Sequence, residues 1–469
     1  MALTVRSIIG ILLERGGEKQ DHARERYRRV ARTGLTAGLN KVVSLAVSIL
    51  TVRLTYQYLG AERYGMWMTI SSAVLMLSFA DFGMSAGLVN LVADALGKED
   101  RKAAQRAAAS ALCILSAVAA VFAITALAVY PYVNAGRLFN VHSALAVKEA
   151  APALLVFFFS FVLNLPLGVV RGTQTGMQNT AATNLWGIVG TALSLVALLV
   201  TIHWHAGLPL LVLGLSFPPV VASLLNGGEL FLWSHPDLFP NPARFSRETA
   251  KRLLQTGLMY FLLLISFSIG LQTDNIVIAQ IMGATAVSAF AVPARLFNML
   301  LAFVNLISST MWPAYADALA RHDGPWIRRG FLRVVRWSML ITAVITVLFV
   351  VFGNAILHVW VGPQVHASLP LLILFGVQCM LYAYLQPIGF FLNGIGQLRA
   401  QVICGLIMTV VNLGLSIVLV KNYGIIGAVT GTVVALSVVQ VVPLTWVVRR
   451  ELSRLPGLAK EQHAAPAQS

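Results

Sequence analysis

The stretch AASALCILSAVAAVFAITALAVYPY, from Ala108 to Tyr132, decides the fold and contains no charged residue. At 1.5 Å per residue, an apolar helix of about 20 residues crosses the hydrocarbon core of a bilayer. The chain holds eleven further runs of this kind, so the sequence predicts twelve transmembrane helices. Their predicted ranges are 36–58, 64–90, 108–132, 149–170, 181–203, 208–233, 255–281, 286–316, 334–359, 368–391, 400–420 and 425–448.

The composition agrees with this prediction. Of 469 residues, 58% are hydrophobic and 11% are charged, whereas a soluble domain carries about 25% charged residues. A soluble fold of this length has too much surface to hide so many apolar side chains. The sequence therefore predicts an all-α polytopic membrane protein.

The net charge of +16 follows the membrane topology. With the N-terminus placed in the cytosol, 26 lysines and arginines outside the spans fall on the cytosolic side. The opposite side holds only Arg63, Arg137, Lys148 and Lys421. Positive loops stay inside, so both termini are predicted to be cytosolic. The chain has no soluble basic face for nucleic acid, and its basic N-terminal arm is expected to meet anionic membrane lipid.

The two halves of the sequence resemble each other at an offset of 223 positions. That offset aligns Leu59-Gly60-Ala61 with Met282-Gly283-Ala284, and Asp100 with Asp323. Each half carries six predicted helices, which indicates two pseudo-symmetric six-helix lobes with a path between them. The predicted segments are a basic cytosolic arm (1–35), an N-lobe (36–234), a cytosolic linker or interfacial helix (235–254), a C-lobe (255–448) and a cytosolic tail (449–469).

Five ionisable residues lie inside predicted spans and away from their cytosolic ends, and each costs about 2.5–3.5 kcal/mol at mid-helix. Lys41 and Arg53 share the first span, which contains no acid. Cations without an acid in their own helix extend to the interface, or face water, a partner on another helix or an anion. Two such cations in one span would suit an anion that is held at two depths in turn. Asp274 and Arg295 lie at similar depths on successive spans, which fits an ion pair or a substrate role. Asp81 is expected to cap a helix or to form an ion pair in the bundle.

The remaining polar residues are less specific. Amide side chains such as Asn298, Asn305 and Asn412 are explained by bonds between helices, although a cavity for sugar hydroxyls would use the same residues. The three cysteines have no metal or redox spacing. The sequence has no nucleotide-binding loop and no catalytic constellation, so we expect neither an enzyme nor a cofactor or metal.

Several motifs resemble a known family. They are Leu59-Gly60, Tyr64-Gly65, Leu77-Ser78-Phe79-Ala80-Asp81-Phe82-Gly83, Asp274-Asn275, Arg295-Leu296-Phe297 and Trp312-Pro313-Ala314-Tyr315. They are similar to bacterial polysaccharide transporters, the Wzx-type oligosaccharide flippases of the multidrug/oligosaccharidyl-lipid/polysaccharide exporter superfamily. The resemblance covers the whole chain in helix number and length, and it implies a fold like that of the multidrug transporters of this superfamily.

The resemblance implies a function. An undecaprenyl-pyrophosphate-linked oligosaccharide would pass from the cytosolic to the periplasmic leaflet by alternating access, for O-antigen, capsule or exopolysaccharide synthesis. Arg53 and Arg295 would bind the pyrophosphate, with Lys41 as an inner relay. Asp274 would neutralise Arg295 or carry a coupling proton, in transport driven by an H⁺ or Na⁺ gradient. A polysaccharide polymerase and chain-length proteins would be partners.

Three other functions stay open at this point. A multidrug or cation antiporter of the same superfamily needs a carboxylate in an early helix, where this chain has cations. A peptidoglycan-precursor flippase typically has two more helices. A membrane subunit of a polysaccharide assembly complex would not transport at all.

Overall fold

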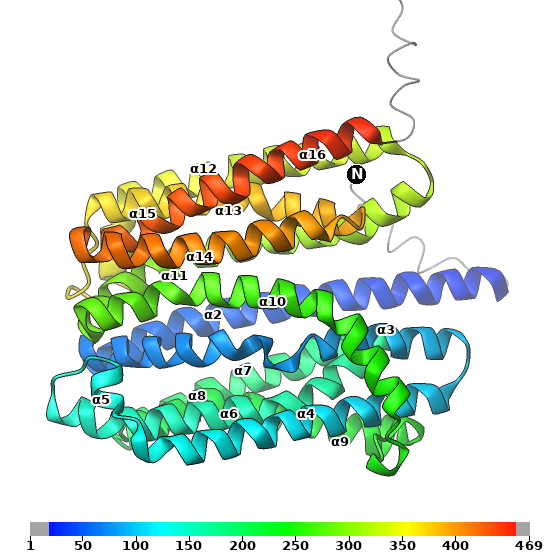
Figure 1. Ribbon diagram of the computed structural model, residues 1–469, viewed down its shortest axis with the longest axis horizontal. Coiled ribbons are helices and arrows are strands. Elements are labelled where there is room, and N and C mark those ends of the chain that lie inside the picture. Colours follow the sequence, from blue (N-terminus) through cyan, green and yellow to red (C-terminus); the bar gives the residue numbers. More distant parts are fainter. Residues whose placement is uncertain (1–17, 456–469) are drawn as a thin grey trace, which may run out of the picture. The chain divides into compact units, whose positions relative to one another are not determined.

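The computed structural model describes the backbone of residues 18–455 (Figure 1). Side chains are described for residues 32–455, except 78, 259, 260, 262–264, 266–271, 306, 313, 316, 317 and 320. Most of the predicted arm and tail, residues 1–17 and 456–469, lies outside the described residues. Within residues 18–455 the chain contains helices and turns and no strand, so the predicted all-α class is confirmed.

The helices follow the predicted spans closely. In chain order they are α2 (Glu18–Leu75), α3 (Met84–Gly97), α4 (Arg101–Val129), α5 (Ala135–Leu138), α6 (Ala144–Gly176), α7 (Thr180–His203), α8 (Leu208–Ser216), α9 (Pro218–Gly228), α10 (Arg247–Met282), α11 (Ala284–Ala320), α12 (Gly324–Trp360), α13 (Leu369–Gly394), α14 (Leu398–Tyr423), α15 (Ile425–Ala435) and α16 (Val442–Arg454). Short 3₁₀ or π-helical segments join several of them, including Met76–Asp81 after α2.

Ten helical stretches among the described residues are long and apolar enough to cross a membrane. One of them, Arg32–Gly97, has 66 residues and is broken at Gly60, whose φ of 73° and ψ of 175° are not helical. This stretch is therefore long enough to cross the membrane twice. Helix α10, with 36 residues, is a further long helix that is not among the ten stretches. The protein is a multi-pass membrane protein, and its helices are consistent with the predicted twelve.

The predicted repeat is visible in the backbone. Gly60 and Gly283, 223 positions apart, both adopt positive φ, at 73° and 88°. Glycine adopts this conformation without the steric cost of a Cβ atom. Asp100 and Asp323 cap α4 and α12 in the same way, each accepting a bond from the amide three residues ahead, at 2.9 and 3.0 Å. The two halves are therefore built on one local pattern.

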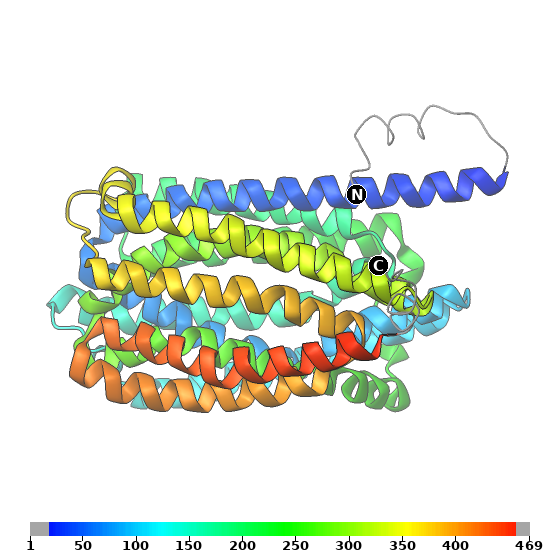
Figure 2. The ribbon, with the colours of Figure 1, turned by 90° about the horizontal axis from the view of Figure 1, so that it is seen from above.

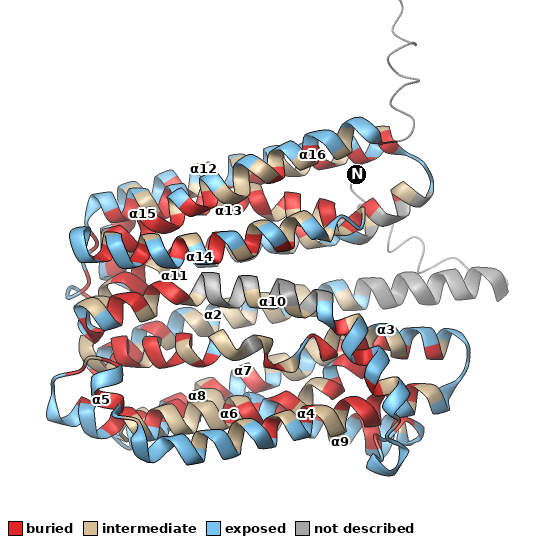
Figure 3. Cartoon of the chain, in the orientation of Figure 1, coloured by how far each residue is buried: buried red, intermediate tan, exposed pale blue. Residues whose placement is uncertain are grey.

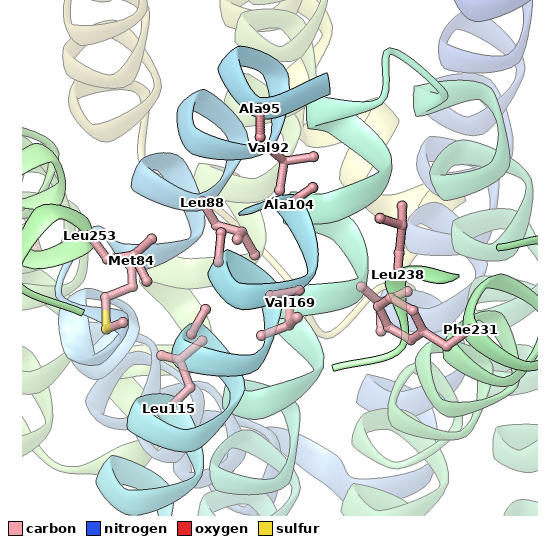
Figure 4. Packing of buried hydrophobic residues seen from close by; sticks show 14 of the residues in the cluster. Met84, Leu88, Val92, Ala95, Ala104, Leu115, Val169, Phe231, Leu238 and Leu253 are labelled. Atoms are coloured by element: carbon pink, nitrogen blue, oxygen red, sulfur yellow. The ribbon is translucent and has the colours of Figure 1, made fainter. Parts of the chain in front are cut away.

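The chain forms two compact units. Unit 1 consists of Met1–Thr51, Ala80–Pro131 and Phe158–Leu258, and unit 2 of Val52–Phe79, Tyr132–Phe157 and Met259–Ser469. In unit 1, the apolar face of α3 packs on the small residues of α4, as Figure 4 shows for Leu88, Val92 and Ala104. The boundaries predicted for the two lobes stay a prediction.

Unit 2 holds an aromatic core between α11, α12 and α13. The ring centroids of Phe331 and Phe391 lie 4.9 Å apart, and those of Tyr315 and Phe391 lie 5.7 Å apart. Helices α12, α13 and α16 run side by side in Figure 2. Along α12, Val344, Val347 and other large apolar residues are exposed (Figure 3). In a protein of this composition such a surface faces lipid.

The run predicted as one span over 64–90 is interrupted. A 3₁₀ segment, Met76–Asp81, ends α2, and Phe82 and Gly83 follow with φ of 49° and 69°. Gly257 of α10 packs on this turn, because a Cβ there would stand 2.8 Å from the Phe82 carbonyl oxygen. The break therefore gives α10 a place to approach the backbone closely.

Helix α10 begins earlier than predicted. It starts at Arg247, inside the stretch 235–254 that is predicted as a cytosolic linker or interfacial helix. Ser246 caps it, because its Oγ accepts a bond from the amide of Thr249 at 3.3 Å. This is the N-cap arrangement that serine favours at the start of a helix.

Candidate functional site

Asp274 lies in a pocket of oxygen atoms inside unit 2. It belongs to α10 and is only 8% exposed. Thr432 of α15 donates to its Oδ2 at 2.9 Å, and Ser416 of α14 donates to its Oδ1 at 3.0 Å. Asn412 Oδ1 lies 3.0 Å from the same Thr432 hydroxyl. Three helices thus converge on one carboxylate.

This cluster has more acceptors than protons. The side chains of Asp274, Asn412, Ser416 and Thr432 supply five oxygen atoms, and the two hydroxyl groups and the Asn412 amide supply four protons. A proton or a small cation would satisfy the remaining lone pairs, because both bind to carboxylate, amide and hydroxyl oxygens. Arg295, the predicted ion partner, is not among the contacts of Asp274 in the described residues.

Arg295 is exposed on α11 and lies beside the first half of the chain. Its charge interacts with the buried phenol of Tyr64. The Tyr64 ring in turn meets Tyr56 edge to face, with centroids 5.3 Å apart. Arg295 therefore lies near a tyrosine that precedes it by more than 200 residues.

Arg295 begins an exposed polar face of α11. Asn298, Asn305 and Trp312 follow it at helical spacing and are also exposed. At 100° per residue the four side chains fall within about 100° of arc. A second face with exposed apolar residues, Phe303 among them, is suited to lipid. A third face belongs to the buried core and includes Leu296, Phe297, Leu300, Val304 and Ser308.

The same side of α11 is buried before Arg295. Ala284, Ser288 and Ala291 precede it at the same spacing and are covered, with Ser288 2% exposed. A Cβ at Gly65 would stand 1.7 Å from the Ala284 carbonyl oxygen. We call this region the Gly283 end, defined by Gly65, Gly283, Ala284 and Ser288. Arg295 lies on α11 at the boundary between the buried surface of the Gly283 end and the exposed polar face.

Other contacts at the Gly283 end join distant parts of the sequence. Asn275 donates to the Ser72 hydroxyl at 2.8 Å. Arg63 and Glu149 form a bidentate ion pair, in which Nε donates to Oε2 at 2.7 Å and Nη2 donates to Oε1 at 2.8 Å. This charge pair is largely buried, since its side chains are 16% and 10% exposed. These bonds connect the C-terminal part of α2 with α10 and with α6.

The other predicted site residues are found as follows. Arg53 is exposed on α2 in unit 2, one turn before Gln57. Lys41 is partly buried in unit 1, next to Asn40, which packs on Gly187 of α7. Asp81, also in unit 1, accepts a bond from the Gly83 amide at 2.9 Å. Unit 2 therefore contains Arg53, Asp274 and Arg295, and unit 1 the other two.

Sequence reasoning did not single out Ser416 and Thr432. Hydroxyl residues are common in membrane helices, so neither stands out in the sequence. The polar face of α11 was detectable, because residues 295, 298, 305 and 312 recur at the helical period. Hydropathy averages over a span do not register that spacing.

Comparisons with known proteins define the class. A family model described as polysaccharide biosynthesis protein matches residues 31–319. A Yersinia pseudotuberculosis protein named for O-antigen export is 20% identical over 405 residues, 84% of this chain and 90% of that protein. A Salmonella typhi protein named for O-antigen transport is 22% identical over 282 residues, 60% of this chain and 63% of that protein.

Solved structures share the fold. The inward-facing form of a multidrug-resistance transporter of the MATE family, in the MOP superfamily, superposes with a TM-score of 0.75. It is 17% identical, and the match covers 91% of this chain and all of that one. Fold and composition thus define a membrane protein with the MOP-transporter architecture. The chain belongs to the polysaccharide biosynthesis protein family, and the predicted resemblance is confirmed.

Proposed function

We propose that the protein is a flippase for surface polysaccharide synthesis. It moves an undecaprenyl-pyrophosphate-linked oligosaccharide from the cytosolic to the periplasmic leaflet of the bacterial inner membrane. Family membership and the O-antigen names of two relatives support the substrate class. The observation that carries the proposal is Arg295, an exposed cation on a membrane helix, followed by polar side chains on the same face.

The chemistry of Arg295 suits a pyrophosphate. A guanidinium group offers a planar fork of donors that matches phosphate oxygens. An exposed cation at membrane depth is costly unless it meets water or an anion. Arg53 is a second exposed cation in the same unit and would share the pyrophosphate. Lys41 would receive the headgroup nearer the cytosol.

Transport would proceed by alternating access. In this proposal the Gly283 end is the periplasmic end, and it is shut in the present structure by the close contact of Gly65 with Ala284. The headgroup would enter from the cytosolic side, reach Arg295 and leave when the Gly283 end opens. Both termini would be cytosolic, as the distribution of lysine and arginine indicates.

Asp274 would couple transport to an ion gradient. Its five-oxygen cluster can take up a proton or Na⁺, which would change the charge inside α10, α14 and α15. These helices pack closely around the cluster, with α14 and α15 in extended contact. Ion binding there would shift their packing and so bias the two end states.

The test is glycan export in a strain that depends on this protein. Arg53→Ala and Arg295→Ala should each reduce surface glycan at normal expression, and Arg295→Lys should restore part of it. Arg252→Ala removes an exposed arginine paired with Glu248 and serves as the control. Full export by both alanine variants would overturn the assignment. Drug resistance without glycan export would favour an antiporter.

A further inference from the structure

The polar face of α11 is longer than a pyrophosphate needs. From Arg295 to Trp312 it extends 17 residues, about 25 Å of helix. Beyond Arg295 its exposed polar members are neutral amides and an indole. Exposed amides gain nothing from lipid, so they face water or a polar ligand. We propose that Asn298, Asn305 and Trp312 bind the sugar portion of the substrate.

The chemistry of these side chains is that of carbohydrate binding. Each amide offers two donors and one acceptor oxygen, which suits neighbouring sugar hydroxyls. Asn298 and Asn305 are separated by two turns, about 10 Å. Trp312 is 39% exposed and is held against Phe390 with ring centroids 6.3 Å apart. Its indole supplies a flat apolar surface and a polar N–H at the far end of the face.

This inference rests on the proposed function, and one binding experiment separates the two. The full chain in lipid nanodiscs is titrated with undecaprenyl pyrophosphate, and separately with the same lipid carrying the host oligosaccharide. Asn298→Ala/Asn305→Ala should weaken binding of the glycosylated lipid about tenfold or more and leave the bare lipid unchanged. Arg295→Ala should weaken both.

The control is Asn422→Ala, which removes an exposed amide bonded only within its own helix, to the Val418 carbonyl. If the unaltered protein binds neither lipid, the proposed function fails. If it binds both, and the double variant affects neither lipid or both equally, the sugar-binding role of α11 is wrong.

A separate observation concerns the Gly283 end. Gln57 donates its side-chain amide to the Val361 carbonyl at 3.0 Å, and Gln280 donates to the Leu138 carbonyl. Gln57 and Gln280 are 223 positions apart, and so are Leu138 and Val361. The two hydrogen bonds are therefore equivalent, because each joins a glutamine side chain of one repeat to a main-chain carbonyl group of the other repeat. We call these two hydrogen bonds the glutamine clasp. We infer that they keep the Gly283 end closed and break when it opens.

The acceptors explain why the bonds form. Leu138 is the last residue of α5, and Val361 is the C-terminal cap of α12. Carbonyl groups at helix ends lack partners within the helix. Each glutamine amide thus meets an available acceptor of the opposite repeat. Two single hydrogen bonds, unlike a large apolar contact, can be broken at low cost.

The clasp predicts an opening equilibrium. Ser288→Cys in a background without the three native cysteines reports opening, because residue 288 is buried there. In nanodiscs, a membrane-impermeant maleimide should label it about fivefold faster with Gln57→Leu or Gln280→Leu, and about 25-fold faster with both. Gln401→Leu removes a glutamine bonded within the second repeat and should change nothing.

Equal labelling of the double variant and its parent would overturn the clasp. If the leucine variants do not accumulate, Gln57→Asn/Gln280→Asn provides the same test, because asparagine keeps the polarity and loses the reach. Glycan export is measured in parallel. A change in labelling with unchanged lipid binding separates the clasp from the substrate site.

Discussion

A Cβ atom at Gly65 would stand 1.7 Å from the carbonyl oxygen of Ala284, closer than any other such contact in the described residues. Both residues lie in unit 2, but they belong to different repeats of the sequence. The backbones of two repeats therefore touch at a position where only glycine fits.

Gly65→Ala should prevent the backbones at positions 65 and 284 from approaching each other this closely. Even one methyl group collides with backbone that cannot move aside as a side chain would, and overpacking of this kind costs about 1–3 kcal/mol. We expect a lower melting temperature of the purified protein and reduced glycan export. Gly414→Ala, at a helical glycine with open space around it, is the control. Unchanged melting of Gly65→Ala would contradict the close contact.

Asp274→Asn should uncouple transport from its driving ion. The amide keeps an acceptor for Ser416 or Thr432, so the protein should fold, but it can neither take up a proton nor neutralise Na⁺. Substrate flux measured in vesicles should then be the same with and without an imposed gradient. Asp94→Asn, which alters an exposed carboxylate paired with Lys98, should remain gradient-dependent. Gradient-driven flux in Asp274→Asn would rule out coupling at this residue.

Breaking the Arg63–Glu149 pair should destabilise the fold. Removing one member leaves a largely buried charge alone, which costs about 3 kcal/mol. Arg63→Ala should therefore lower the melting temperature clearly, and Arg63→Met/Glu149→Leu should restore most of it. Lys98→Ala breaks an exposed pair worth less than about 1 kcal/mol and is the comparison. A single variant as stable as the parent would show that the pair is not buried within the protein.

Substitutions of Asp81 can distinguish a role in capping the turn at Gly83 from a role in ion coupling. Asp81→Asn keeps the oxygen that accepts the Gly83 amide, whereas Asp81→Ala loses it at a cost of about 1 kcal/mol. If the carboxylate only shapes the turn, export should survive Asp81→Asn and fall with Asp81→Ala. Loss of export in both variants at equal protein levels would assign the charge a role in transport.

The sequence predicts most of the architecture, because hydrophobic length and charge asymmetry are imposed by the bilayer itself. The turn at Gly60 and its counterpart at Gly283 were found by the repeat offset. The break at Met76–Asp81 was not found, since it interrupts the helix without lowering the hydropathy. Local backbone geometry of this kind is set by the approach of Gly257, which is distant in sequence.

The site was predicted in part. Asp274 and Arg295 were picked out by their cost in lipid, but their surroundings depend on three-dimensional packing. The partners of Asp274 come from α14 and α15, more than 130 residues away. No spacing rule connects Asp274 with Ser416 or Thr432. The nearness of Arg295 to Tyr64 likewise depends on how the chain folds, because the two residues are more than 200 positions apart.

The crossed bonds of Gln57 and Gln280 end on main-chain carbonyls, which every residue type possesses. Substitutions at Leu138 and Val361 therefore leave the acceptors intact so long as the helix ends stay in place. The two copies of the repeat can diverge in side chains, as leucine and valine already have, and still fasten to each other. In this clasp the two glutamine donors and the backbone acceptors keep the symmetry, and the side chains at the acceptor positions are left free to make the two halves chemically different.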